Sequence, residues 1–406
     1  MNPSIAVVLL AVVINMSGVG LIWPILPAMV ERLNGGSIAQ VATAYGAVAV
    51  VYSIAQFLFA PVMGALSDRF GRRRVMLVAL LALGIDSIVT ALAPNLFWMF
   101  VARFIGGALA STFSIAQAYV ADVTDENDRA AGFGMIGAAF GIGFIIGPLI
   151  GGVLGEIDLR LPFFFAAALS FANFLLGLAF LRETLPPERR KPAPWHAIVP
   201  LAALWFVLRD RGLLLLGLAL LSANTVQRGL ESIWVLFTDV QYGWGTREAG
   251  LSLAVVGLSF FVVQGFLVRR VVAAIGEIAA VTAGFCLSAA VYLVLAFNTA
   301  GWVGFVGILP HVLGWGVAGP ALQAIASRRV DASRQGQLQG SLTAIAGLAA
   351  ILGPATATTA FAFFTSALAP VHFPGAYFLV GVVFLLLAAA LPRFAQAGPG
   401  ATPKGD

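Results

Sequence analysis

Long continuous runs of apolar residues constrain this chain more than any other feature of its sequence. A helix needs about 20 apolar residues to cross a lipid bilayer, and runs of that length recur from the first residues to about residue 392. The runs are continuous rather than alternating, which favours spanning helices over the strands of a membrane barrel. Among the 406 residues, 60% are apolar and only 10% are charged, which is too apolar for a soluble fold. This composition excludes a soluble enzyme, a nucleic-acid binder and a disordered chain.

The apolar runs predict twelve membrane spans, separated by polar, acidic or proline-rich segments. The fold class expected is therefore an all-α membrane protein. The first run has no basic segment before it and is longer than the apolar part of a signal peptide, so we expect it to be retained as a span. The predicted spans lie at roughly 5–29, 42–66, 75–93, 96–120, 130–154, 161–181, 213–238, 250–268, 278–296, 301–326, 336–364 and 374–392.

The distribution of positive charge predicts the orientation of the spans. Most arginines and lysines fall in the loops that follow even-numbered spans, and only Arg32, Arg160 and Arg247 fall on the opposite side. Cytoplasmic loops carry the excess of Lys and Arg, so we expect both termini in the cytoplasm and the chain in the inner or plasma membrane. These loops account for the net charge of +5. The partner expected is therefore the lipid bilayer, and no nucleic acid is expected.

A charged, proline-rich segment divides the chain into six spans and six. The predicted domains are residues 1–181, a cytoplasmic linker at 182–212, residues 213–392, and a cytoplasmic tail at 393–406. Within the linker, His196–Leu208 is expected to form a short interfacial helix. The halves also share a pattern, because an arginine precedes spans 5 and 11 and a Gly-Pro pair lies inside each of them. Such a parallel repeat predicts two six-helix bundles related by pseudo-symmetry.

Two sequence motifs carry a resemblance to a known family. Residues 64–76 read GALSDRFGRRRVM and resemble the signature of the major facilitator superfamily. Residues 141–152 read GIGFIIGPLIGG and resemble the signature of its proton-coupled drug antiporters. The segments GVGLIWPILP, AYVADVTDENDRAAGFG, IWVLFTDVQYGW and GPALQAIAS are similar to the tetracycline efflux antiporters. The resemblance implies a monomeric transporter of a small molecule that is driven by a proton gradient and holds no cofactor.

The first motif predicts a conformational latch. Two of its glycines permit a close backbone approach and a tight turn, and Asp68 is placed to cap a helix end or to pair with Arg129 at the start of span 5. The resemblance implies that this latch holds the two halves in an outward-facing state. The alternative is that the basic residues only fix the topology. The predicted latch residues are Gly64, Asp68, Arg69, Gly71, Arg72 and Arg129.

The second motif predicts a close helix contact. Gly143, Gly147 and Gly151 are four residues apart and share one face of span 5. Another helix can approach such a face closely, and Pro148 adds a kink. One interpretation is a rigid contact between the halves that also limits proton leak, and the other is ordinary helix packing.

Five ionisable side chains lie inside predicted spans, where charge is costly and usually functional. They are Asp86 in span 3, Arg103 in span 4, Arg228 and Glu231 in span 7, and His311 in span 10. Asp86 is the expected partner of Arg103, and this arginine resembles the proton-relay motif of drug antiporters. We predict that Asp86, Arg103, Glu231 and His311 couple transport to protons. The alternative for the Asp86–Arg103 pair is a purely structural role.

The span 7 pair and the histidine leave alternatives open. Arg228 and Glu231 stand three residues apart and share a helix face, so they are placed to pair. The alternative is that both are solvated near the periplasmic mouth. His311 is either a packing residue that makes a hydrogen bond or a proton carrier, because histidine titrates in the useful range.

Single amides on otherwise apolar spans predict a polar cavity, because buried amides need hydrogen-bond partners. An interhelical hydrogen bond is the alternative for each amide, and the aromatic residues offer a flat apolar surface or simply pack. The predicted cavity residues are Asn15, Gln56, Gln117, Asn224, Gln227, Arg228, Phe260, Gln264, Trp315 and Gln323. No metal site is expected, since the chain has one cysteine, Cys286.

Three positions depart from the tetracycline pattern. That branch carries an acidic residue in span 1, a histidine in span 8 and an acidic residue in span 9, where this chain has Asn15, Phe260 and Ser288. Asp86 and Gln56 match their counterparts. We therefore predict export of an amphipathic drug-like compound, with tetracycline-like molecules as candidates, in exchange for protons by alternating access.

Other functions remain as alternatives. One is a facilitator or proton-coupled transporter of a different small metabolite, and another is a membrane sensor or scaffold that transports nothing. No nucleophile set or phosphate-binding loop is visible in the sequence, so neither an enzyme nor an ATP-driven pump is expected.

Overall fold

The computed structural model describes residues 3–110, 112–123, 129–186, 188, 190, 204–331 and 334–396. Regular secondary structure within these residues is helical apart from turns, and they contain no strand. The all-α fold class predicted from the apolar runs is therefore confirmed.

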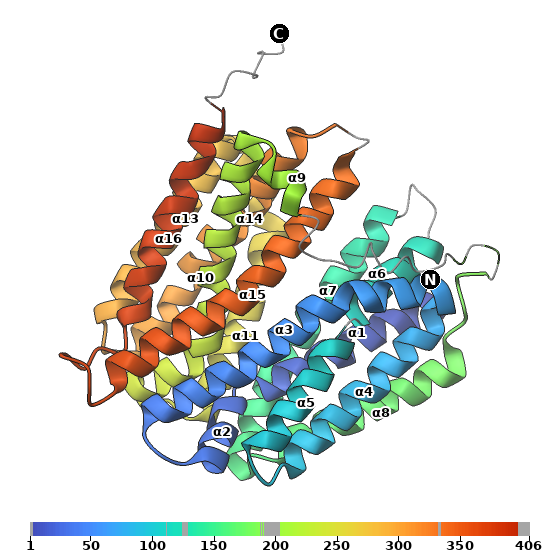
Figure 1. The fold of residues 1–406 in the computed structure, drawn as a ribbon, viewed down its shortest axis with the longest axis horizontal. Coiled ribbons are helices and arrows are strands. Elements are labelled where there is room, and N and C mark those ends of the chain that lie inside the picture. Colours follow the sequence, from blue (N-terminus) through green and yellow to red (C-terminus); the bar gives the residue numbers. More distant parts are fainter. Residues whose placement is uncertain are drawn as a thin grey trace. The chain divides into compact units, whose positions relative to one another are not determined.

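The described helices before the linker are well delimited by local signals (Figure 1). The side chains of Ser37 and Gln40 form a capping box at the start of α3. Helix α3 ends at Gly71, whose φ of 100° favours glycine, and the same residue begins α4. The helices are α1 (Pro3–Ile22), α2 (Leu26–Asn34), α3 (Ile38–Phe70), α4 (Arg72–Leu92), α5 (Leu96–Leu109), α6 (Thr112–Val123), α7 (Arg129–Ile157) and α8 (Leu161–Phe180).

The second series of helices begins inside the predicted linker. Helix α9 is the described part of the interfacial helix expected at 196–208, and residues 196–203 lie outside the described residues. The helices are α9 (Leu204–Leu208), α10 (Arg211–Tyr242), α11 (Thr246–Val262), a π-helix (Val263–Leu267), α12 (Val268–Ile275), α13 (Glu277–Phe297), α14 (Gly301–Arg328), α15 (Gln335–Thr365) and α16 (Ala376–Gln396).

Helix α16 corrects the predicted boundary of the C-terminal tail. It continues to Gln396, so the first residues of the segment expected at 393–406 are helical. Arg393 lies in the last turn of α16, where a positive charge interacts favourably with the helix dipole. Residues 397–406 lie outside the described residues.

The number of spans agrees with the sequence prediction. Among the described residues, eleven helical segments are long and apolar enough to cross a membrane, and α1 with α2 makes a twelfth if they form one bent span. Two of the eleven are composite: α5 continues into α6, and α11 continues through the π-helix into α12.

The first span, predicted at 5–29, is bent. Helices α1 and α2 meet at an angle of 44°. Pro24 and Pro27 lie at or just after this break, and proline lacks the backbone N–H that continues a helix. The prediction followed the apolar run and did not weigh the two prolines.

The chain forms two compact units. Unit 1 comprises residues 1–199 and 238–258, and unit 2 comprises residues 200–237 and 259–406. The linker predicted at 182–212 contains the main boundary, but the end of α10 and most of α11 belong to unit 1. In unit 1, α1 packs along α7 and α8, and α4 packs along α5 and α8. In unit 2, α13 packs against both α14 and α16.

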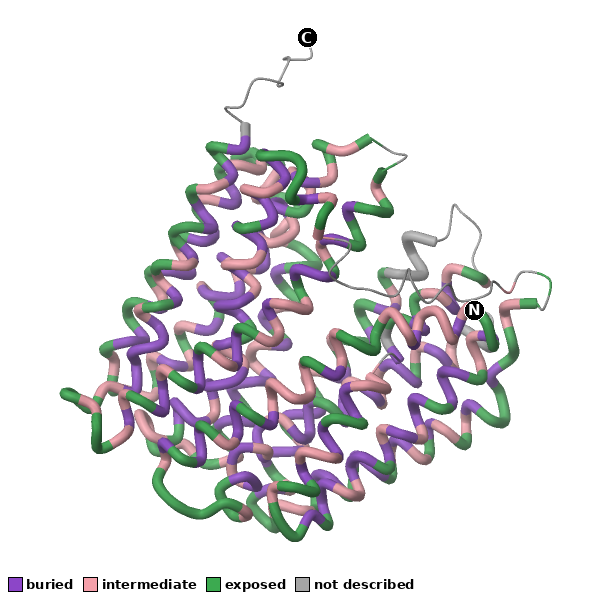
Figure 2. Tube along the Cα trace, viewed as in Figure 1, coloured by how far each residue is buried: buried purple, intermediate pink, exposed green. Residues whose placement is uncertain are grey.

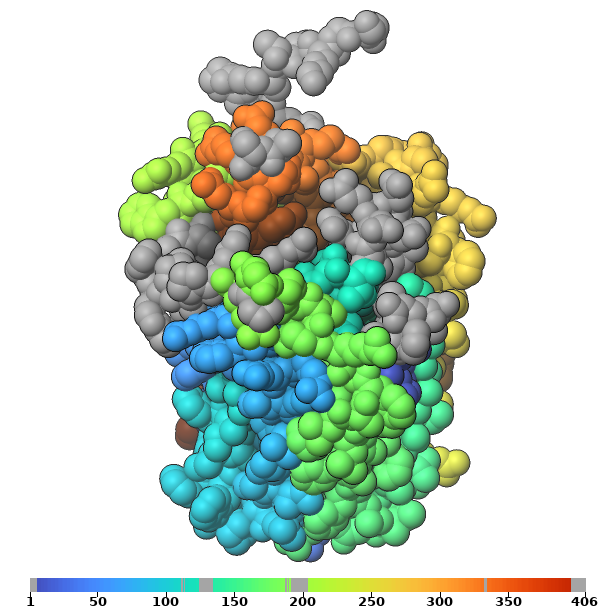
Figure 3. All heavy atoms as spheres, turned by 90° about the vertical axis from the view of Figure 1, so that its right-hand side faces the viewer, coloured from blue at the N-terminus to red at the C-terminus, as the bar shows by residue number. Residues whose placement is uncertain are grey.

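Each unit combines a buried core with an apolar exterior (Figure 2). Buried residues run along one side of many helices and exposed residues along the other. The core of unit 1 includes Val12, Met76 and Tyr119, whereas outward leucines such as Leu175 remain 62% exposed. Lipid tails cover such side chains in a membrane. In the space-filling view of Figure 3, the green segment after α8 lies beside the blue atoms of α4.

Candidate functional site

A buried ion pair lies between α4 and α5 in unit 1. Arg103 donates through Nη2 to Oδ2 of Asp86 and, at 3.1 Å, to Oγ1 of Thr90. Asp86 is 3% and Arg103 is 8% exposed, so both charges are held away from solvent. Gly106 lies one turn after Arg103, and a Cβ at Gly106 would stand 2.9 Å from Cγ of Asp86. The predicted pairing is confirmed, and glycine at this position leaves room for it.

The pair keeps unused hydrogen-bonding capacity. Oδ1 of Asp86 and Nε of Arg103 are buried and have no hydrogen-bond partner among the described residues. The guanidinium of Arg103 also lies over the ring of Tyr52, 5.9 Å from its centroid. Most buried polar atoms in proteins are partnered, so these two atoms stand out as available hydrogen-bonding groups beside the pair.

A pocket of about 100 Å³ adjoins this pair in unit 1. Tyr52 and Gly106, which contact the ion pair, contribute to its wall. The structure thus brings together two of the predicted cavity amides, Asn15 and Gln56, and Gln56 donates to the backbone of Ala110 at 3.5 Å. The pocket is lined by Asn15, Met16, Val19, Tyr52, Gln56, Ala79, Leu83, Gly106, Leu109, Ala110 and Thr112.

Gln117 is not part of this pocket. It lies on α6, its side chain is exposed, and it is absent from the lining residues. The sequence could not separate it from Asn15 and Gln56, because all three are single amides on apolar spans.

Unit 2 holds a different polar arrangement, on α10 and α14. Nη1 of Arg228 lies 2.9 Å from Oε2 of Glu231, which confirms the predicted pair. Gln227 donates to the other oxygen of Glu231 at 3.3 Å. Its own carbonyl oxygen lies 3.2 Å from Nε2 of His311. Two residues predicted for proton coupling and two predicted for the cavity are therefore linked by a continuous series of hydrogen bonds. They are Glu231 and His311, and Gln227 and Arg228.

The other predicted cavity residues of unit 2 do not take part in this series of hydrogen bonds. The rings of Phe260 and Trp315 meet edge to face, 5.7 Å between centroids, and Gln264 donates to the backbone of Gly316 at 3.2 Å. Asn224 donates to Leu220 of its own helix. Gln323 is exposed. Among these remaining residues, Gln264 makes an interhelical bond, which was the alternative to a cavity role.

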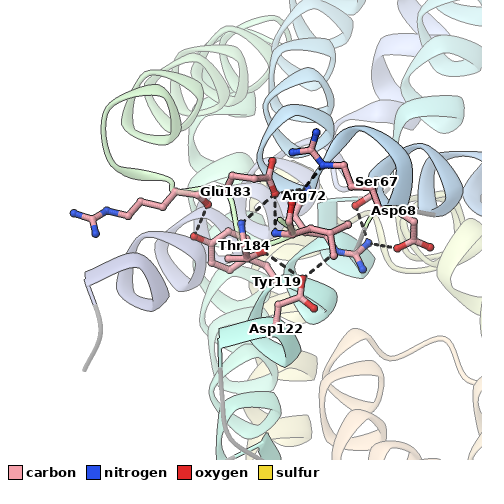
Figure 4. A network of polar contacts seen from close by, with 10 residues as sticks. Ser67, Asp68, Arg72, Tyr119, Asp122, Glu183 and Thr184 are labelled. Atoms are coloured by element: carbon pink, nitrogen blue, oxygen red, sulfur yellow. Dashed lines mark hydrogen bonds and ion pairs between the residues drawn. The ribbon is translucent and has the colours of Figure 1, made fainter. Parts of the chain in front are cut away.

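Arg72 is the centre of the predicted latch region (Figure 4). Its guanidinium lies 2.6 Å from Oδ1 of Asp68 and 3.2 Å from Oδ2 of Asp122, and it donates to Ser67 at 3.0 Å. The backbone N–H of Arg72 donates to Glu183, after α8, at 2.9 Å. This network ties the starts and ends of four helices of unit 1 together.

The latch residues differ in how far they match the prediction. Asp68 pairs with Arg72, and the side chain of its expected partner, Arg129, lies outside the described residues. The tight turn at Gly71 is confirmed by its φ of 100°. At Gly64, no described atom lies within 4 Å of the position of a Cβ, so the predicted close approach is not found there. The guanidinium of Arg69 lies over the neighbouring ring of Phe70.

Unit 2 contains a similar contact with reversed charges. Gly276, with a φ of 76°, precedes Glu277, the first residue of α13. Glu277 forms an ion pair with Arg328 in the last turn of α14. In unit 1 the residue after the glycine is Arg72, and its partner near the end of the next span is Asp122. We call the Arg72–Asp122 and Glu277–Arg328 ion pairs the braces. The sequence analysis did not identify Asp122, Glu277 or Glu183 as site residues. The available signal was the presence of opposite charges at the ends of spans on the same predicted side of the membrane.

The glycines of α7 pack on α1. A Cβ at Gly143 would lie 2.6 Å from the carbonyl oxygen of Val13, and one at Gly147 would lie 2.5 Å from that of Ser17. Gly151 meets the backbone of Leu21 in the same way. The close approach is confirmed, but the partner is α1 of the same half, not a helix of the other half.

The last glycine of the motif meets a helix of the predicted C-terminal half. Gly152 faces α11, where Thr246 donates to its carbonyl oxygen at 3.2 Å within unit 1. Nearer the start of α7, a Cβ at Gly137 or Gly141 would meet no described atom within 4 Å. Helix α7 continues through Pro148, whose ring would lie 2.6 Å from a Cβ at Gly20 of α1.

Charges held inside spanning helices, in two compact helical units, are features of a multi-pass membrane transporter. The chain belongs to the Major Facilitator Superfamily, whose family model matches residues 8–354. The resemblance stated from the sequence motifs is thereby confirmed.

Curated relatives within this superfamily include tetracycline resistance proteins. The chain is 38% identical to the class C tetracycline resistance protein of Escherichia coli over 365 residues, which cover 89% of this chain and 90% of that protein. It is 34% identical to the class G tetracycline resistance protein of Vibrio anguillarum, with 97% and 98% covered.

Solved structures agree with the fold. The human organic anion transporter MFSD10 is 27% identical with a TM-score of 0.71, and the match covers 96% of this chain and 99% of that one. The nucleoside transporter NupG, at 13% identity and a TM-score of 0.80, covers 98% of this chain and 100% of that one and supports the fold alone. These neighbours are transporters and not enzymes, and the chain is likewise a transporter.

Proposed function

We propose that this transporter exports an amphipathic drug-like compound, with tetracycline-like molecules as candidates, in exchange for protons by alternating access. The observation that carries the proposal is the buried Asp86–Arg103 pair beside a mainly apolar pocket that holds two amides, in a chain that is 38% identical to a tetracycline resistance protein. The proposal places the chain in the cell membrane with both termini in the cytoplasm. It needs a proton gradient and no cofactor, and we expect a monomer.

Asp86 and Arg103 supply the proton-dependent step. A proton added to the free Oδ1 of Asp86 neutralises the carboxylate and removes the charged partner of Arg103. In the ionised state, Oδ1 of Asp86 is available to a cationic or hydrogen-bond-donating group of a substrate in the adjoining pocket. Protonation of that oxygen removes the acceptor and releases the group. Substrate and proton thus compete for one site, and each favours its own facing state.

In each unit taken by itself, the predicted cavity residues combine polar groups with apolar or aromatic ones. Asn15 and Gln56 offer amides in the pocket of unit 1. Phe260 and Trp315 offer aromatic surface in unit 2, and Gln264 lies close to them on the chain. Ligand sites are commonly apolar with a few placed polar groups, so this composition supports a drug-like molecule rather than a sugar.

The test is transport in proteoliposomes with an imposed pH gradient, against a substrate panel that includes tetracycline. We expect at least one amphipathic compound to be taken up in response to the gradient. Asp86→Asn should abolish gradient-driven uptake while the protein still elutes as a folded species. Unchanged uptake by Asp86→Asn would remove Asp86 from coupling.

A second candidate is a facilitator, or a proton-coupled transporter of a different small metabolite. It is favoured by the neutral residues at the three positions where the sequence differs from the tetracycline efflux antiporters. Asn15 lines the pocket, Phe260 packs on Trp315, and Ser288 donates to the backbone of His311 at 3.3 Å, so none of them supplies a charge. Substrate movement that does not respond to any imposed pH gradient would establish the facilitator.

A further inference from the structure

In unit 2, the hydrogen bonds that link Arg228, Glu231, Gln227 and His311 have a fixed donor-to-acceptor direction. Glu231 accepts from Arg228 at 2.9 Å, as an ionised carboxylate does. A carboxylate has only acceptor oxygens, so Gln227 presents its NH₂ group to Glu231 at 3.3 Å. The carbonyl oxygen of Gln227 is then turned toward His311. The ion pair therefore sets the orientation of the amide.

The amide in turn sets the tautomer of His311. A carbonyl oxygen only accepts, so Nε2 of His311, 3.2 Å from it, must carry the hydrogen. A neutral imidazole has a single N–H, which leaves Nδ1 with an unprotonated lone pair. That atom is buried and has no hydrogen-bond partner among the described residues.

Among the described contacts of His311, the partners are uncharged: the amide of Gln227, the ring of Tyr292 and, through its backbone oxygen, Ser288. The ring of Tyr292 on α13 lies 5.3 Å from that of His311, and its hydroxyl is also buried and without a partner among the described residues. Tyr377 on α16 donates to backbone oxygens of α10. The charged groups of α10 within two turns of Gln227 are Glu231 and the half-exposed Arg228, which pairs with Glu231; Arg211 and Asp239 lie toward the two ends of the helix.

We infer that Nδ1 of His311 is a proton-binding site in unit 2, that Gln227 is the positioning residue that keeps this nitrogen unprotonated, and that Glu231 stabilises the imidazolium through the amide. The step adds one proton to the lone pair of Nδ1 and breaks no other bond. Gln227 thereby changes from a predicted cavity residue to a positioning residue. The inference deepens the proposed proton exchange and rests on it only for the role of the site in transport.

The test is nitrogen-15 NMR of the protein, labelled at its histidines, in lipid nanodiscs. The sequence has three histidines, and loss of a signal in His311→Asn assigns the resonance. At high pH we expect a single neutral tautomer with the hydrogen on Nε2, and at low pH a protonated Nδ1. Hydrogen on Nδ1 in the neutral form, or no protonation over the pH range in which the protein stays folded, would overturn the inference.

Two amide variants separate positioning from general packing. Gln227→Met removes the acceptor at Nε2 and should leave His311 as a mixture of both tautomers. Gln264→Met removes an equivalent amide that bonds Gly316 in the same unit and should leave the His311 tautomer unchanged. A single tautomer in both variants would contradict the role of Gln227, and the spectrum of the unsubstituted protein remains decisive if either variant fails to fold.

Transport assays on the same preparation distinguish the two proposals. The expected spectrum without any gradient-driven transport would refute the proposed proton exchange and uphold the protonation site. Gradient-driven transport with the opposite tautomer would refute the site and uphold the exchange.

Discussion

The two units hold charge inside their helices in opposite ways. In unit 1, Asp86 and Arg103 bind each other directly, and both are almost fully buried. In unit 2, the Arg228 side chain is 53% and that of Glu231 is 25% exposed. The side-chain amide of Gln227 forms a hydrogen bond to Glu231 on one side and to the buried His311 on the other. Burial decides what a missing partner costs, so equal substitutions in the two units should have unequal effects.

The largest effect is expected when the buried pair of unit 1 is broken on one side. Arg103→Leu leaves the Asp86 carboxylate unpaired in the interior, which costs about 3–5 kcal/mol. The double variant Asp86→Asn with Arg103→Leu removes both charges and should recover most of that loss. The measurement is the free energy of unfolding in detergent, and a double variant no more stable than Arg103→Leu would contradict the comparison.

The braces should give a smaller effect, of about 1 kcal/mol, because their partners are partly exposed. Glu277→Arg places two positive charges together in unit 2, and Arg328→Glu in the same chain should restore the pair. In unit 1, Arg72→Glu should not be rescued by Asp122→Arg, since Asp68 and Glu183 also contact Arg72.

Thermal unfolding of these single and double variants is the measurement. Equal rescue in both units would show that Arg72 acts as half of one pair rather than as the centre of a network.

The exposed pair of unit 2 should contribute least among the ion pairs. An Arg–Glu pair three residues apart on a helix is worth about 0.3–0.5 kcal/mol. Replacement of Arg228 and Glu231 by Gln, singly and together, should therefore change the free energy of unfolding little. Transport should respond differently, with the double change costing less than either single one if the pair acts as a unit. Additive transport losses would show that the two residues act separately.

The smallest expected effect is the pH dependence of one helix start in unit 2. The backbone N–H of Leu213, followed by the guanidinium of Arg329, lowers the pKa of Asp210 despite partial burial. A folded-state pKa below the unfolded value adds stability above the unfolded pKa, and this is lost as the pH falls through the folded value. Asp210→Asn should therefore flatten the acid limb of a melting-temperature profile. An unchanged acid limb would show that Asp210 carries no such stabilisation.

Local patterns explain which features were predictable. Run length indicated the spans, and three-residue spacing indicated the Arg228–Glu231 pair, since both depend on neighbours in the chain. Contacts between distant segments were not predictable in the same way. Gln227 and His311 are separated by 84 positions, and Glu183 by 111 from Arg72, so their contacts depend on how helices pack.

The same reasoning explains what the sequence left open. The bend between α1 and α2 was not resolved because apolar content was weighed above the prolines, and two interpretations of the α7 glycine face remained because a helix face does not reveal which helix covers it.

Helix α7 also determines where experimental probes fit. Its contact with α1 is backbone against backbone, so even a methyl group at Gly147 would act as a wedge. Gly137 and Gly141 have open space beside them on the same helix, and a cysteine there accepts a spin label or fluorophore without displacing a neighbour. Since Cys286 is the only native thiol, its replacement by serine provides the background in which such a label reports on α7 alone.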